Sequence, residues 1–169
     1  LHLEAIQVFG DSRPLARLAL ARDLLLLERP REALEWIESG AREEGVDSLE
    51  LAARALEMLG RHQEAARRLE RLLERPGAEE RPGGREALRR RIGGLLLREA
   101  EAAEEEGRLE EALALFRRAL SWNHALNRAR AGVVALLQAL GRERQAGVEL
   151  QRHLEELDRL AEDPEFRML

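Results

Sequence analysis

One short sequence pattern recurs four times along the chain and constrains its fold more than any other feature. It runs from a turn into a helix-forming stretch that contains an alanine, at residues 29–34, 60–66, 107–113 and 141–147. The four alanines, Ala33, Ala65, Ala112 and Ala146, lie 32, 47 and 34 residues apart. Recurrence at a period of roughly 20–50 residues is typical of proteins that stack one supersecondary unit several times.

The residues between these copies favour helices. Leu, Ala, Glu and Arg dominate, aromatic residues make up only 3%, and the chain has no Lys, Thr, Tyr or Cys. A hydrophobic share of 44% supports a buried core and argues against disorder. Because the residues that favour strands are scarce, we predict an all-α chain.

The repeated pattern resembles that of the tetratricopeptide repeat family, whose unit is a helix, a tight turn and an antiparallel second helix. The family's second helix carries an alanine followed four residues later by an aromatic residue, and Ala112 and Phe116 match that step. Aliphatic residues take the aromatic position in the other copies: Ile37, Leu69 and Leu150. The first helices match less well, because the family's Trp, Gly and Tyr are absent from them.

The resemblance implies a right-handed superhelical array of antiparallel helix pairs, a tetratricopeptide-like α-solenoid in a single domain. We expect its four units at about 14–45, 46–78, 93–126 and 127–160. A loop insertion is expected at about 75–85, where Pro and Gly are concentrated. Residues 1–12 are interpreted as a remnant or cap helix, and a C-terminal cap helix is expected to run to about 163.

Glycines are expected to end the first helix of three units. Gly60, Gly107 and Gly141 fall just past these helices, where a left-handed residue is favoured. In the first unit, Pro30 supplies a preset φ at the start of the second helix. Short connections of this kind make paired helices antiparallel.

Charge, hydropathy and motifs disfavour several classes of function. The net charge is −5 and Arg is interleaved with Glu, so there is no broad positive field for nucleic acid. The cluster at residues 89–91 is interpreted as a helix surface paired with Glu86 and its neighbours.

No apolar run is long enough to span a bilayer. The four histidines lack metal-ligand spacing, and no nucleophile or phosphate-loop motif is present, so we assign no metal, cofactor or catalytic residue.

In the tetratricopeptide family the first helices line a concave groove that holds a segment of another protein. Carried over position by position, the resemblance implies groove residues on four helices: Leu15, Leu18, Arg22 and Leu25; Asp47, Glu50, Arg54 and Glu57; Gly94, Leu97, Glu101 and Glu104; Arg128, Ala131, Ala135 and Gln138. Acidic residues predominate in the middle, so we expect a partner protein or peptide that carries basic residues. The chain is therefore interpreted as a protein–protein interaction scaffold or adaptor. The alternative is a regulatory or sensory helical-repeat domain of a larger protein, such as a bacterial transcription regulator.

The start of the chain suggests that it continues upstream. Leu1 is not an initiator methionine and no signal segment follows it, so we expect the original N-terminus to have been lost by trimming, processing or disorder, and whether further repeats or domains precede residue 1 stays open. A stacking face around Leu3, Ile6 and Phe9 would then favour assembly into a homo-oligomer. The lack of cysteine fits intracellular and exported proteins alike, and a cytoplasmic location is our working expectation.

Overall fold

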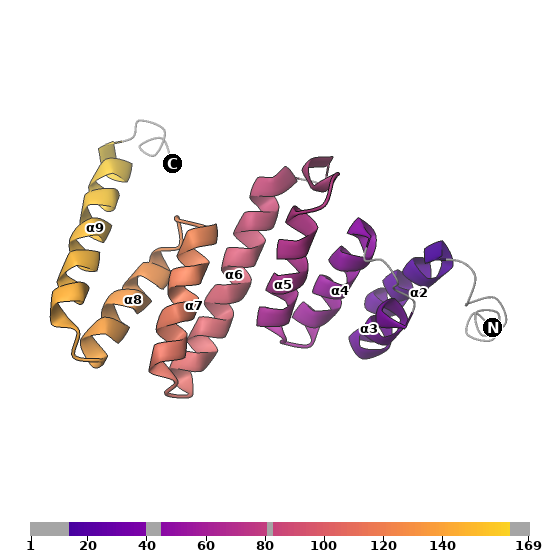
Figure 1. Cartoon of the computed structure of the whole chain (residues 1–169), viewed down its shortest axis with the longest axis horizontal. Helices are drawn as coiled ribbons and strands as arrows, with labels where there is room; N and C mark the ends of the chain where they lie inside the picture. The colour runs from indigo at the N-terminus through magenta and orange to yellow at the C-terminus, as the bar shows by residue number, and fades with distance from the viewer. Residues whose placement is uncertain (1–13, 40–44, 81–82, 163–169) are drawn as a thin grey trace. The chain divides into compact units, whose positions relative to one another are not determined.

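A computed structural model describes residues 14–39, 45–80 and 83–162, and the expected helix at 1–12 lies outside them. The described residues form α-helices and one short 3-10 helix, with no strand among them, so the predicted all-α class is confirmed (Figure 1). The helices are α2 (Pro14–Leu26), α3 (Pro30–Glu38), α4 (Val46–Met58), α5 (His62–Leu73), η1 (Ala78–Glu80), α6 (Gly84–Glu105), α7 (Leu109–Trp122), α8 (Asn127–Ala139) and α9 (Glu143–Glu162). The chain divides into two compact parts, which we call the N-terminal part (Leu1–Leu95) and the C-terminal part (Leu96–Leu169).

In the N-terminal part, successive helices form pairs that pack on one another. Helix α2 packs against α3 and α4 against α5, and α4 also packs against both helices of the first pair. Ala21 and Ala53 on the first helices, and Ala33 and Ala65 on the second, are all 0% exposed. A short side chain at these positions lets paired helices approach to the lower end of the usual range of ~8–10 Å. These are the small positions of the repeat pattern.

In the C-terminal part, α8 packs against α7 on one side and against α9 on the other. Phe116, the aromatic residue of the repeat pattern, is fully buried on α7. Its ring lies against Gly132 of α8, where an added Cβ would stand 2.8 Å from the ring atoms Cε2 and Cζ. That separation is shorter than ordinary van der Waals contact. The close packing of the ring therefore depends on the missing side chain at residue 132.

The four turns between paired helices share one hydrogen-bond pattern. The Gly60 N–H donates to the Glu57 carbonyl at 3.0 Å, and the Arg61 N–H donates to the Leu56 carbonyl at 2.9 Å. These are the two bonds of a Schellman motif, which requires a residue of positive φ at the end of the helix. Glycine supplies it in three of the turns, as predicted: Gly60 (φ 72°), Gly107 (φ 75°) and Gly141 (φ 71°).

The first turn has the same bonds but lacks the glycine. Glu28 adopts φ 57°, and its N–H donates to the Leu25 carbonyl at 3.2 Å. Pro30 does begin α3, as predicted, yet the turn itself is made by Glu28. A side chain in the left-handed region costs about 1–2 kcal/mol. This turn therefore carries a strain that the other three avoid.

The predicted unit boundaries can be placed beside the observed helices. The expected loop at 75–85 contains η1, whose Ala78 is buried, and α6 begins at Gly84. Helix α6 continues through Gly94 without a break. Helix α9 ends at Glu162, next to the expected end of the cap helix. The division into units remains a prediction.

Candidate functional site

A hollow of about 460 Å³ lies among three helices of the N-terminal part. Helix α2 contributes Arg22 and Leu26, and the start of α6 contributes Arg91. Helix α4 contributes four further lining residues: Asp47, Glu50, Leu51 and Arg54. Residues three and four positions apart share one face of a helix, which explains why Asp47, Glu50 and Arg54 line the same hollow.

Among the residues that the structure describes, only some of the charges around the hollow have a partner. Arg91 donates from Nε to Oε1 of Glu57 at 2.7 Å, and both side chains are partly buried. Asp47 and Glu50 also take part in polar interactions. Arg22 and Arg54 make no ion pair or side-chain hydrogen bond within the part of the chain that the structure describes. Two guanidinium groups, each with five donors in a planar fork, are thus available at this surface.

Exposed apolar side chains continue along the same face of α2. Leu26 lines the hollow and is 67% exposed, and Leu15 is 80% exposed. Eleven residues make close to three helical turns, so Leu15, Arg22 and Leu26 follow one line along the helix. Large exposed apolar residues next to unpaired cations give this surface both apolar and polar contact groups.

The structure brings together some predicted groove residues and separates others. Arg22 and Arg54 line the hollow, and Glu57 adjoins it through its bond to Arg91. Leu25 is only 3% exposed and belongs to the core, so it is not part of this surface. Its neighbour Leu26 takes that place.

The predicted residues of the C-terminal part form a separate group. Arg128 of α8 donates from Nε to Oε1 of Glu101 at 3.0 Å, and its Nη2 lies 3.5 Å from Oε2 of Glu104. Gln138 is exposed on α8. Arg128 is shared by the two carboxylates, so the cation of this surface already has partners within the chain.

Sequence reasoning missed three residues of the hollow, namely Leu26, Leu51 and Arg91. Arg91 belongs to the cluster that the sequence paired locally with Glu86 and its neighbours. Its partner is instead Glu57, which lies 34 residues earlier on a different helix. The separation of 34 residues is close to one repeat period. Only this spacing could have indicated the contact between Arg91 and Glu57.

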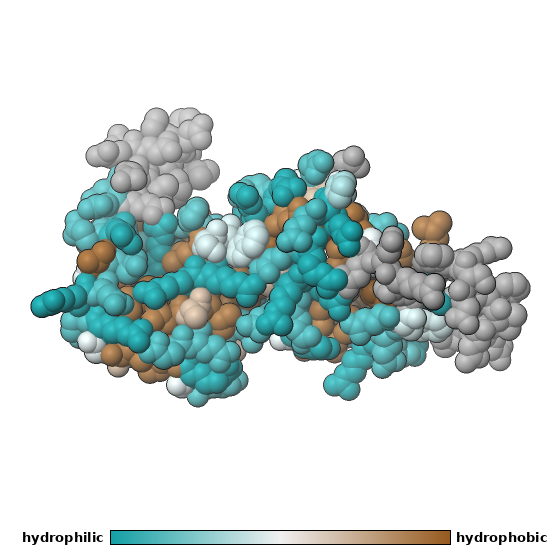
Figure 2. Space-filling model, in the orientation of Figure 1, coloured by the Kyte–Doolittle hydropathy of each residue, from teal (hydrophilic) through white to brown (hydrophobic). Residues whose placement is uncertain are grey.

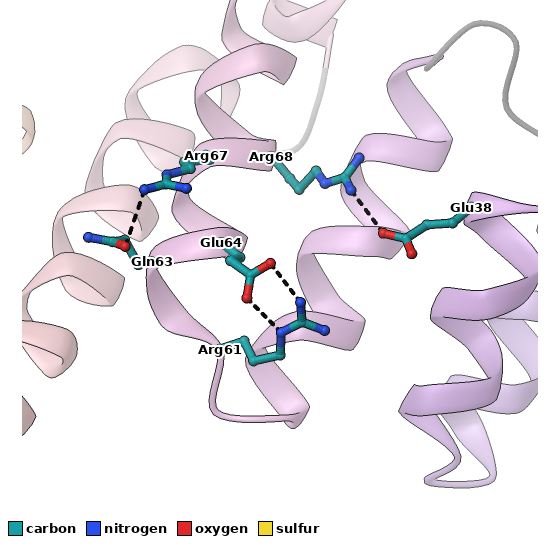
Figure 3. A network of polar contacts seen from close by, with 6 residues as sticks. All are labelled: Glu38, Arg61, Gln63, Glu64, Arg67 and Arg68. Carbon is teal, nitrogen blue, oxygen red and sulfur yellow. Dashed lines mark hydrogen bonds and ion pairs between the residues drawn. The ribbon is translucent and has the colours of Figure 1, made fainter.

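The second helices carry a different kind of polar surface, in which charges are paired within the chain (Figure 3). Arg61 donates to both carboxylate oxygens of Glu64, at 2.7 and 2.6 Å. Arg68 of α5 donates to Glu38 of α3 at 2.9 Å. The hydrogen bond from Arg61 lowers the pKa of the Glu64 carboxyl below its ordinary value. Glu64 lies in the first turn of α5, where the helix dipole also favours a negative charge.

The Arg–Glu pair at the start of a second helix recurs along the chain. Arg29 pairs with Glu32, and Arg108 pairs with Glu111. The fourth copy has glutamine at the matching position, and Arg142 of the turn before α9 pairs with Glu110 of α7 instead. Hydrophilic residues cover much of the face seen in Figure 2, with hydrophobic ones between them.

Two classes of site were sought among the described residues. In those ranges no three His, Cys, Asp or Glu side chains gather closely enough to hold a metal ion. None of the helices described is both long enough and apolar enough to cross a membrane.

Comparisons with known proteins support the fold. No family model matches the chain, and no curated protein matches its sequence. Among solved structures, a crystal structure of MamA protein has 13% identity and a TM-score of 0.51, covering 96% of this chain and 82% of that one. A second MamA structure has 13% identity and a TM-score of 0.49, covering 96% and 88%. A human IFIT1 dimer with PPP-AAAA has 18% identity and a TM-score of 0.43, covering 90% and 35%. The first of these similarities shows that the chain has a tetratricopeptide-like helical-repeat fold.

Proposed function

We propose that the chain is a degenerate tetratricopeptide repeat protein of about four units that acts as a scaffold or adaptor. It binds a segment of a partner protein in the hollow formed by α2, α4 and α6. The observation that carries this proposal is the convergence of Arg22 and Arg54, both predicted from the repeat register, on one hollow with exposed Leu26 beside it.

The contrast between the two kinds of surface supports this choice. On the second helices, Arg and Glu side chains are paired with each other, as in Arg61 with Glu64 and Arg68 with Glu38. The charged groups of these exposed ion pairs already have partners within the chain. In the hollow, Arg22 and Arg54 offer donors that a partner can engage, and Leu26 offers apolar area. Interfaces are typically built from such apolar contacts and arginines.

The hollow also bears on the chemistry of the partner. Acidic positions predominate in the middle of the predicted groove, which led us to expect a basic partner. The unpaired cations here favour a segment that carries an acidic side chain for Arg22 or Arg54 next to an apolar residue for Leu26. Basic residues of the same segment would then lie near Asp47 and Glu50. The partner segment we propose is thus amphipathic and of mixed charge.

The test compares two double variants that change charge equally. The purified chain is used to capture partner proteins, which are then quantified for Arg22→Glu/Arg54→Glu and for the control Arg31→Glu/Arg67→Glu on the second helices. The amount of captured protein should fall about tenfold or more with the first variant, because attraction between the two arginines and an acidic partner becomes repulsion. The control variant should capture as much protein as the wild type. Equal capture by wild type and both variants, with helical circular dichroism preserved, would show that the hollow is not the binding surface.

A further inference from the structure

Helices α2 and α4 carry the same pair of exposed side chains at equivalent positions of the repeat. Arg22 and Arg54 each stand eleven residues before the alanine of the repeat pattern, and Leu26 and Met58 each stand seven residues before it. All four side chains are exposed. Residues four apart share one face of a helix, so each of these helices presents an arginine and a large apolar side chain together.

The two pairs are neighbours in space. Helix α2 packs against α4, and Arg22, Leu26 and Arg54 line one hollow. The axes of packed helices are ~8–10 Å apart, which sets the distance between equivalent positions on the two helices. Along each helix, four residues rise about 6 Å. The surface therefore has a row of two arginines and, parallel to it, a row of two apolar side chains.

Neither arginine forms an ion pair with another described residue, and the local reasons differ. Glu57 lies three residues after Arg54, within reach of it, but its carboxylate accepts a hydrogen bond from Arg91 at 2.7 Å. The equivalent residue on α2 is Leu25, which is buried. An acidic side chain of a partner can thus pair with Arg22 and with Arg54 in the same way.

The equivalent positions of the later helices carry different residues. They are Glu101 and Glu105 on α6, and Ala135 and Ala139 on α8. Glu101 already accepts a hydrogen bond from Arg128. The pair of an arginine and an apolar residue is therefore confined to α2 and α4, and it offers a partner two equivalent points of contact.

We propose that the segment bound in this hollow is extended and has two acidic residues three positions apart, each next to an apolar residue. This inference rests on the proposed function and specifies its ligand. An extended chain of the polyproline II type has three residues per turn and rises about 3.1 Å per residue, so residues three apart lie on one side, about 9.3 Å from each other. That distance matches the separation of adjacent helices. The residue next to each acidic one points to another side, toward Leu26 or Met58.

A helical segment fits this arrangement less well. Lying across α2 and α4, it would present acidic residues seven apart, at about 10.5 Å, on its contact face. The other residues of that face are three or four positions further along, so they lie between the two arginines and not in the apolar row beside them. The two parallel rows therefore favour an extended segment.

The test measures the affinity of the full chain for synthetic seven-residue peptides by calorimetry. Both peptide ends are blocked, so no terminal charge contributes. The matched peptide has two glutamates three positions apart, each followed by leucine, with alanine elsewhere. Two peptides of the same composition have their glutamates two or four positions apart, and the matched peptide should bind about tenfold more tightly than either. Equal affinity, or no saturable binding of the matched peptide up to about 1 mM, would overturn the proposal.

Two further peptides test the apolar row and the extended conformation. Replacing both leucines of the matched peptide with alanine should weaken binding about tenfold, because the apolar contacts are lost. A fourteen-residue peptide with its glutamates seven positions apart represents the helical arrangement. Binding of this longer peptide as tight as that of the matched one would refute an extended ligand.

Variants of the chain identify the individual contacts. Arg22→Gln and Arg54→Gln should each weaken binding of the matched peptide about tenfold, because each removes a charge-assisted hydrogen bond. When one glutamate of the peptide is replaced with glutamine, one of these variants should lose its effect and the other should keep it. The control Arg31→Gln, on α3, should leave binding unchanged. If both variants keep their full effect on both glutamine peptides, the glutamates do not pair with the arginines one to one and the proposal is wrong.

Failure of this inference can be distinguished from failure of the proposed function. If the spacing of the glutamates has no influence but Arg22→Glu/Arg54→Glu still abolishes capture of partner proteins, the hollow is the binding surface and its ligand lacks the spacing proposed here. If capture also survives that double change, the hollow is not the binding surface and both proposals fall.

Discussion

Replacing Gly132 with alanine tests the contact on which the packing of α7 against α8 depends. The added Cβ would stand 2.8 Å from two ring atoms of Phe116, where real Cβ atoms are essentially never found. Phe116 is 0% exposed, so its ring is enclosed by other residues and cannot turn out into solvent. Overpacking of this kind costs about 1–3 kcal/mol. Alanine also gains about 1 kcal/mol over glycine inside a helix, and the net loss of stability should therefore be about 0–2 kcal/mol.

A matched substitution separates these two effects. Gly147 lies inside α9, and nothing stands within 4 Å of a Cβ added there. Gly147→Ala should therefore show only the gain in helix propensity. The free energies of unfolding of the two variants should differ by about 1–3 kcal/mol.

Chemical and thermal unfolding followed by circular dichroism measure this difference. In a chain of this size, 1 kcal/mol shifts Tm by about 2–4 °C. Adding Phe116→Leu to Gly132→Ala should recover part of the loss, because the smaller side chain makes room for the new methyl group. If Gly132→Ala and Gly147→Ala stabilise the chain equally, the ring does not pack against residue 132 and the reasoning is wrong.

Two further predictions concern the turns and the polar surface. Glu28→Gly should stabilise the chain by about 1 kcal/mol, because glycine adopts the left-handed conformation without strain; a Tm no higher than that of the wild type would contradict this. The lowered pKa of Glu64 means that its bond to Arg61 contributes stability above the ordinary carboxyl pKa and loses it as the pH falls through the folded-state value. Glu64→Gln should therefore flatten the dependence of unfolding free energy on pH at and below the ordinary carboxyl pKa, and an unchanged dependence would show that the pair contributes nothing.

The local features of the fold could be predicted because they depend on residues close together in the chain. The helical periodicity, the buried alanines and the glycine turns follow from backbone geometry and side-chain size over a few residues. Glu28 was missed because glutamate does not favour the left-handed region, so its residue type gives no sign that the chain turns there.

The candidate site could be predicted in part. Arg22 and Arg54 were found because their register places them on the exposed face of a first helix. The repeat register predicted Leu25 as a groove residue, but Leu25 is 3% exposed. The exposed leucine is its neighbour Leu26, which is 67% exposed. One residue rotates the side chain by about 100° around the helix, and the run of four leucines from Leu24 to Leu27 contains no signal that distinguishes them.

The sequence by itself determined that this chain is an array of paired helices, because the repeat, the turns and the small packing positions are encoded within each unit. The tertiary structure alone decided which groups meet across units. It paired Arg91 with Glu57 on another helix, placed Arg22 and Arg54 beside an exposed leucine with no ion pair to another described residue, and placed Arg130, Arg152 and His153 around one hollow. Such contacts depend on the rotation and spacing of neighbouring helices, which are set by the whole core and not by any short stretch of residues.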